Sequence, residues 1–150
     1  MRPRVATCNG RYGFLTLMWM AGIYWLSSRS DLGPSGNDPV VQIASNLAHL
    51  PLFAGLAFCW FKTLAAMPHA SWRRYGVAFL ASATWAGLDE WHQSFVPGRE
   101  ASVVDSVLDL AGIIGMLLIL RLWAVHESRA ARTMSLESPG SSARVASWKV

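Results

Sequence analysis

The sequence predicts an all-α membrane protein with four transmembrane helices and both termini in the cytoplasm. Hydrophobic residues make up 53% of the 150 residues and charged residues only 15%, which is unusual for a soluble protein of this size. Eight tryptophans indicate the same class, because the indole ring suits the interface between lipid and water. A soluble helical bundle with an apolar core is the alternative that this composition leaves open.

Four stretches of the chain approach the length that a transmembrane helix needs. A bilayer core of about 30 Å requires roughly 20 apolar residues in a helix, and about 17 are tolerated. The predicted spans are residues 12–28, 44–64, 72–91 and 103–125. The third span meets Asp89 near its end, and the fourth contains Asp105 and Asp109 in its first two turns. We therefore expect the polar ends of these two spans at the same membrane face.

The basic residues predict how these helices are oriented, because Lys and Arg are retained on the cytoplasmic side of short loops. Eleven of the thirteen flank the spans on one side, and these are Arg2, Arg4, Arg11, Lys62, Arg73, Arg74, Arg121, Arg129, Arg132, Arg144 and Lys149. The other two, Arg29 and Arg99, lie in the remaining loops. Both termini are therefore expected in the cytoplasm.

The two ends of the chain carry different expectations. The first apolar stretch follows Arg residues, as in a signal peptide, but it lacks a small-x-small cleavage site, so we expect a retained helix. Residues 126–150 are rich in Ser, Arg and Ala with little apolar periodicity. They predict a flexible cytoplasmic tail after a membrane domain of residues 12–125.

The polar residues whose side chains are suited to binding or catalysis lie mainly around residues 89–99, DEWHQSFVPGR. An ionisable group at the centre of a membrane helix costs roughly 2.5–3.5 kcal/mol, so such groups usually face protein or water and often mark function. Gln93 lies one helical turn after Asp89 and Glu90, so a carboxylate and an amide share one surface. These residues are candidates for binding a polar group.

A turn at Pro97 and Gly98 predicts that Arg99 folds back towards the carboxylates. A guanidinium there binds a carboxylate- or phosphate-bearing ligand in bidentate fashion, or it forms a structural salt bridge to Glu90 or Asp105. The sequence leaves both roles open.

The fourth span carries a polar stripe of its own. Asp105 and Asp109 are four residues apart and so lie on one helical face, which Gly112 continues. Two ionised carboxylates at this spacing repel, so either one is protonated or both share a cation. A bare Gly beside the stripe lets another helix come close. The alternative is that Asp105 only caps its helix or pairs with Arg99.

His49 opens the second span just before Pro51 and is expected on the same membrane side. Such a His is either a hydrogen-bonded structural residue or a group for proton transfer or ligation. No metal or other cofactor is expected, because metal-ligand spacing is absent and the donors would have to converge from three helices. A Ser-His-Asp mechanism with Ser94 or Ser102 has no nucleophile-elbow sequence to favour it.

These residues resemble the VanZ-like family of bacterial integral membrane proteins. The family pattern is D-E-x-x-Q-x-F-x-P-G-R, then S-x-x-D and a later Gly, and it is matched by residues 89–99, Ser102, Asp105 and Gly112. The likeness covers residues 14–123, with Asn46 and His49 at the polar opening of the second span. Two departures are Asp109, where the family commonly shows Asn, and Leu52-Phe53, near a position often occupied by Tyr.

The resemblance implies an envelope protein, since the founding member is associated with tolerance of the glycopeptide teicoplanin, but it implies no known reaction. We expect an outer-face site that recognises an envelope lipid or glycan group. The expected binding residues are His49, Asp89, Glu90, Gln93, Arg99, Asp105 and Asp109.

Other functions stay open at this point. One is a membrane enzyme that acts on a lipid-linked substrate with His49 or Glu90 as base, and another is a small transporter or proton-coupled helper. A structural scaffold is the last. Membrane lipids are expected partners, nucleic acid is not, and a homo-oligomer, which a pore would require, is left open.

Overall fold

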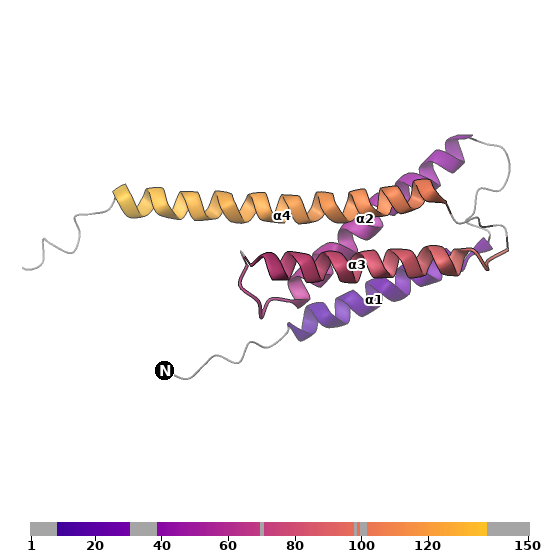
Figure 1. The fold of residues 1–150 in the computed structure, drawn as a ribbon, viewed down its shortest axis with the longest axis horizontal. Coiled ribbons are helices and arrows are strands. Elements are labelled where there is room, and N and C mark those ends of the chain that lie inside the picture. The colour runs from indigo at the N-terminus through magenta and orange to yellow at the C-terminus, as the bar shows by residue number, and fades with distance from the viewer. Residues whose placement is uncertain (1–8, 31–38, 70, 98, 100–101, 138–150) are drawn as a thin grey trace, which may run out of the picture. The chain divides into compact units, whose positions relative to one another are not determined.

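The computed structural model describes residues 9–30, 39–69, 71–97, 99 and 102–137 (Figure 1). It contains four α-helices, which are α1 (Gly10–Ser27), α2 (Pro39–Thr63), α3 (Trp72–Gln93) and α4 (Val103–Glu137). The described residues contain no strand, which confirms the prediction of an all-α fold.

Two helices are longer than the sequence predicts. α2 begins at Pro39 instead of Ala44, because proline at the first helical position loses no hydrogen bond and has its φ already set. α4 continues beyond Val125 to Glu137. Its last part is rich in Ala and Arg, which are strong helix formers and need no apolar periodicity to be helical. Residues 138–150 of the predicted tail lie outside the described residues.

The chain divides into two units, residues 1–118 and residues 119–150. In the first unit α1 packs against both α2 and α3, and α2 packs against α3. Large buried side chains at these contacts include Ile23, Phe53, Leu56 and Phe61. In the second unit the described residues continue α4 as one helix, most of whose side chains are exposed.

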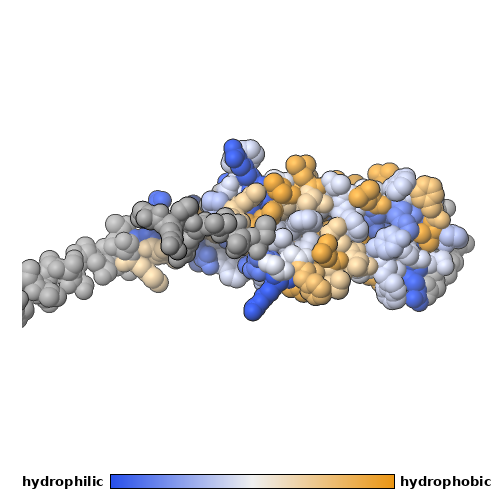
Figure 2. All heavy atoms as spheres, turned by 90° about the horizontal axis from the view of Figure 1, so that it is seen from below, coloured by the Kyte–Doolittle hydropathy of each residue, from blue (hydrophilic) through white to orange (hydrophobic). Residues whose placement is uncertain are grey.

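One helix in the described part of the chain, α4, is long and apolar enough to cross a membrane, over Val103–Met134. All four helices nevertheless carry large apolar side chains on their surface, among them Phe14, Ile43, Leu80 and Val107. Figure 2 shows apolar side chains lying at the surface of the face in view. Among the side chains described in the first unit, ten polar or charged ones are buried, which are Thr16, Ser27, His49, Arg74, Ser82, Asp89, Glu90, Gln93, Asp105 and Asp109.

The contact between α1 and α2 depends on a glycine. The indole of Trp19 lies against Gly55 so closely that a Cβ atom at this position would overlap the ring. Trp19 Nε1 donates a hydrogen bond to the carbonyl oxygen of Leu52 at 2.8 Å. Farther along, the hydroxyl oxygens of Thr16 and Thr63 are 2.9 Å apart. Hydrogen bonds therefore tie α1 to α2 at two levels.

At Gly112 the backbone of α4 approaches the backbone of α2 closely. A Cβ atom at Gly112 would collide with the carbonyl oxygen of Leu50 and would come within 3.2 Å of the backbone nitrogen of Ala54. The obstacle is backbone, so no side-chain rotation can relieve it. The prediction that Gly112 lets another helix come close is confirmed.

We expect Gly112→Ala to lower the free energy of unfolding by about 1–3 kcal/mol, because the new methyl group must push α4 away from α2. Gly115→Ala is the matched control on the same helix, since a Cβ atom there meets nothing within 4 Å. That variant should be unchanged or up to about 1 kcal/mol more stable, because Ala favours helix over Gly. Thermal unfolding of the detergent-solubilised protein measures both, and equal stability of the two variants would contradict the packing argument.

Candidate functional site

Several buried polar side chains of the first unit form two neighbouring clusters where α1 and α3 end and α4 begins. The first cluster joins α1 to α3. Ser27 Oγ donates a hydrogen bond to Asp89 Oδ2 at 2.8 Å, and Gln93 Nε2 donates to the same oxygen at 2.9 Å. Gln93 Nε2 also lies 3.4 Å from Ser27 Oγ. The predicted pairing of Asp89 with Gln93 is present, and Ser27 is a partner that the sequence did not indicate.

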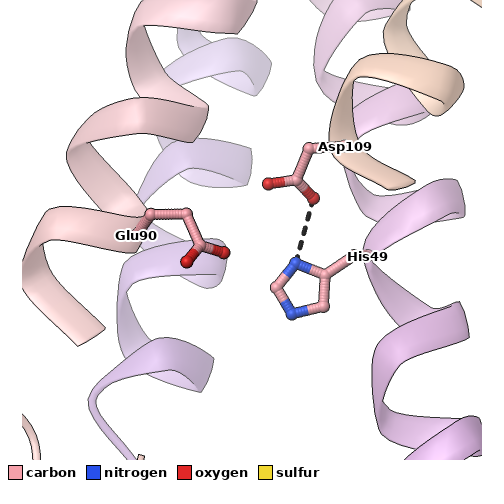
Figure 3. Close-up of side chains that lie close together, drawn as sticks. All are labelled: His49, Glu90 and Asp109. Carbon is pink, nitrogen blue, oxygen red and sulfur yellow. Dashed lines mark hydrogen bonds and ion pairs between the residues drawn. The ribbon is translucent and has the colours of Figure 1, made fainter. Parts of the chain in front are cut away.

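The second cluster joins α2 to α4 through His49 and Asp109. Their Nδ1 and Oδ1 atoms are 2.9 Å apart, and the Asp109 side chain is completely buried (Figure 3). The imidazole stacks on Phe53 of the next helical turn with an interplanar angle of 12°. His49 and Asp109 were each expected in the site, but their pairing was not predicted.

Glu90 links α3 to the first turn of α4. Its Oε2 atom accepts a hydrogen bond from the backbone N–H of Ser102 at 3.0 Å. The Ser102 hydroxyl in turn accepts one from the N–H of Val104 at 3.2 Å, and so caps α4. A carboxylate beside a helix N-terminus is also favoured by the helix dipole. Glu90 therefore positions α4 and reaches the second cluster as well.

Figure 3 shows that His49, Glu90 and Asp109 converge from α2, α3 and α4. One nitrogen or oxygen atom from each lies within 4.8 Å of the other two. The convergence from three helices that argued against a metal site in the sequence is thus present in the structure. The expectation that no cofactor binds remains untested.

Three carboxylate oxygens in these clusters are buried without a hydrogen-bond partner, namely Asp89 Oδ1, Glu90 Oε1 and Asp109 Oδ2. A buried polar atom that lacks a partner costs free energy, and a charged one costs more. The arrangement is therefore suited to a ligand that brings positive charge or hydrogen-bond donors.

A cavity of about 130 Å³ opens beside the clusters. Its polar wall consists of Ser27, Ser45, His49, Asp89 and Arg99, and its apolar wall of Ile23, Leu26, Ala48, Leu52 and Phe53. The volume is enough for several water molecules or one small polar group. Residues from both clusters are therefore accessible from one space.

Arg99 folds back as the turn predicts, but its hydrogen bonds go to a different place. Its Nη2 donates to the carbonyl oxygen of Leu26 at 3.1 Å and its Nε to that of Arg29 at 3.3 Å. The guanidinium nevertheless interacts electrostatically with the carboxylate of Asp105, one of the two partners that the sequence predicts. The last carbonyls of a helix have no partner within the helix and carry its negative partial charge, so they attract a guanidinium.

Arg74 serves the end of α2 in the same way. Its Nε and Nη2 donate to the carbonyl oxygen of Phe61 at 2.9 and 2.7 Å. Its guanidinium also lies 3.9 Å from the centroid of the Phe61 ring. Each of these two arginines therefore stabilises the end of a neighbouring helix.

Asp105 is buried in the first turn of α4. His92, the other His of the motif, lies apart from the clusters. Its Nε2 is 3.0 Å from Ser28 Oγ, and its ring packs on Tyr24 with centroids 4.5 Å apart. Ser94 donates to the carbonyl oxygen of Trp91 and joins no triad among the described residues.

Comparison with known proteins identifies a family for most of the chain. The sequence model of the VanZ/LLP1 family matches residues 9–124. No curated protein and no solved structure matches the chain significantly. The matched range contains every residue of the two clusters.

We expect His49→Leu to lower the free energy of unfolding by about 3–5 kcal/mol, because it leaves the Asp109 carboxylate buried without its partner. The double variant His49→Leu, Asp109→Leu should recover most of this loss, since apolar residues often replace a buried pair at little cost. Unfolding in detergent micelles measures all variants as a double-mutant cycle.

The control is His92→Leu, which removes a partly exposed His and should change stability by no more than about 0.5 kcal/mol. Additive losses in the double variant would show that His49 and Asp109 do not interact.

Proposed function

Because the chain belongs to the VanZ/LLP1 family, we propose that it is an integral membrane protein of the bacterial cell envelope that binds the head group of an envelope lipid or lipid-linked glycan. The cavity beside Ser27, His49, Asp89 and Arg99 carries this proposal. It places buried acceptors next to a small cavity with polar and apolar walls, within helices that expose many large apolar side chains.

The proposed topology has four spans with both termini in the cytoplasm. Its support is the distribution of side chains, because α1, α2 and α3 also expose large apolar residues while they bury polar ones. A soluble protein buries few such charged groups. Lipid around all four helices accounts for the apolar surface, and the bias of basic residues to one side gives the orientation.

The chemistry of the cavity favours a ligand that donates hydrogen bonds. Asp89, which lines the cavity, retains a buried oxygen without a partner, whereas the Nε and Nη2 groups of Arg99 are engaged with carbonyls. Hydroxyl and ammonium groups are suitable donors to this carboxylate. Recognition of a sugar hydroxyl or an amine is therefore proposed ahead of recognition of an anion by Arg99.

The size of the cavity limits the ligand to a small group. Pockets for drug-sized molecules measure roughly 300–1,000 Å³, well above the 130 Å³ seen here. A whole glycopeptide antibiotic does not fit. Any effect on glycopeptide tolerance would therefore act through an envelope component that the antibiotic meets.

The test compares lipids that differ in the head group. We expect the purified protein to retain phosphatidylethanolamine over phosphatidylglycerol in native mass spectrometry, because its ammonium group brings positive charge and donors to the cavity that Asp89 lines. Asp89→Asn should weaken this retention roughly tenfold to a hundredfold, the worth of a hydrogen bond to a charged group.

Glu127→Gln is the control, since Glu127 is exposed on α4 and bonds only to Trp123 among its described neighbours. Preference for phosphatidylglycerol that Arg99→Ala abolishes would overturn the donor-based mode and restore recognition of an anion. Equal retention by all variants would sink the head-group proposal.

A hydrolase acting on a lipid-linked substrate is the second candidate. The His49–Asp109 pair favours it, because a buried carboxylate orients an imidazole as a general base. Release of a water-soluble product from such a lipid by wild-type protein, lost in His49→Gln, would establish turnover in place of simple binding.

The topology has its own test in a cysteine-free background. Ser94→Cys should react with an impermeant maleimide in intact cells, whereas Ala65→Cys and Ser128→Cys should react only after permeabilisation. All three side chains are exposed in the structure, so a lack of reaction reports the membrane and not burial. Labelling of Ser128→Cys in intact cells would reverse the proposed orientation.

A further inference from the structure

We propose that His49, Glu90 and Asp109 bind a single divalent transition-metal ion of the zinc class. This inference goes beyond the proposed function. It shares His49 with the cavity, but it is argued from Asp109 and Glu90, neither of which lines the cavity.

The first support is geometric. The three residues come from α2, α3 and α4, and one donor atom of each lies within 4.8 Å of the others. Figure 3 shows both carboxylates turned towards the imidazole, with the second oxygen of Asp109 on the side of Glu90. Donor atoms around tetrahedral zinc stand roughly 3.4 Å apart, because each is about 2.0–2.2 Å from the ion. The flexible side chain of Glu90 covers the difference by rotation.

The second support is independent of the clustering. Asp109 is completely buried and Glu90 is 9% exposed, yet Asp109 Oδ2 and Glu90 Oε1 have no hydrogen-bond partner. Both of these oxygens belong to the three-residue cluster. Carboxylates are rarely buried in this way unless they are paired or coordinate a metal. The unpaired oxygens thus indicate a missing positive charge at this place.

The donor set selects the kind of ion. One imidazole nitrogen and two carboxylate oxygens suit zinc and its neighbours better than calcium or magnesium, which take oxygen ligands and more of them. Three protein ligands also leave a fourth position open, as in zinc sites that bind water or substrate. The fourth position on the ion is therefore available to a water molecule or a substrate.

Binding of the metal ion needs no other reactant to balance its protons. His49 Nδ1 and Asp109 Oδ1 share one proton across 2.9 Å. An ion that binds the free oxygens of Asp109 and Glu90 and takes His49 Nδ1 as its third ligand displaces that proton to solvent, because metal ligands must be deprotonated. Binding therefore exchanges one proton of this pair for the ion.

The experiment uses the full-length protein in detergent, stripped with a chelator, reloaded with Zn²⁺ and desalted before elemental analysis. Wild-type protein should hold one Zn²⁺ per chain. Asp109→Asn and Glu90→Gln should each bind at least about tenfold more weakly. Both replacements keep the size of the side chain, and the amide oxygen that Glu90→Gln introduces can still accept the N–H of Ser102. Two variants with separate structural roles therefore test the same site.

Asp89→Asn is the matched control, because Asp89 is a buried carboxylate next to Glu90 that bonds to Ser27 and Gln93 outside the three-residue cluster. It should retain its Zn²⁺. Co²⁺ gives a second readout, since coordination by wild type and Asp89→Asn should produce a visible absorption band that Asp109→Asn lacks.

Failure of the wild-type protein to hold a stoichiometric ion, or equal binding by all variants, would overturn the metal site. Either result leaves the head-group proposal standing, because that proposal is measured by lipid retention. Loss of lipid retention with Zn²⁺ binding intact would do the opposite.

Discussion

The close approach of α4 to α2 at Gly112 is the constraint on which the polar clusters depend. Asp109 lies one turn before Gly112 on α4, and His49 precedes Leu50, whose carbonyl touches Gly112. The same approach that brings the two backbones together therefore sets the His49–Asp109 distance. In lipid, apolar side chains gain nothing by leaving the solvent, so small residues at helix contacts and polar bonds across them are what hold helices together.

Near this end, polar contacts also join the remaining helices to the frame. Ser27 connects α1 to Asp89 of α3, and Glu90 connects α3 to the capped start of α4. Few of these side chains reach water, so the strength of each bond benefits from the low dielectric of its surroundings. The same surroundings make every unused oxygen expensive. The residues that connect the helices are thus the same residues whose unpaired oxygens favour a ligand.

Helical spacing correctly predicted which residues share one face of a helix, but it did not predict which residues pair between helices. The stripe of Asp109 and Gly112, and the pairing of Asp89 with Gln93, follow from the rise of one helical turn. The partner of Asp109 does not, because 60 residues separate it from His49 and packing alone selects the pair. The hydrogen-bond partners of Arg99 were missed for a related reason. Arg99 interacts with the carboxylate of Asp105 as the sequence predicts, but its hydrogen bond to the Leu26 carbonyl at the end of α1 is not revealed by any local pattern.

Arg99 donates its hydrogen bonds to carbonyl oxygens at the end of α1 and not to the carboxylates of the two clusters. Asp89, Glu90 and Asp109 then depend on His49 and on whatever enters beside them. Such a site favours cationic ligands within apolar surroundings. It selects a ligand by charge before it selects by shape, and binding of a metal ion releases a proton. Because this proton leaves when the ion binds, the net charge of the clusters rises by less than the charge of the ion.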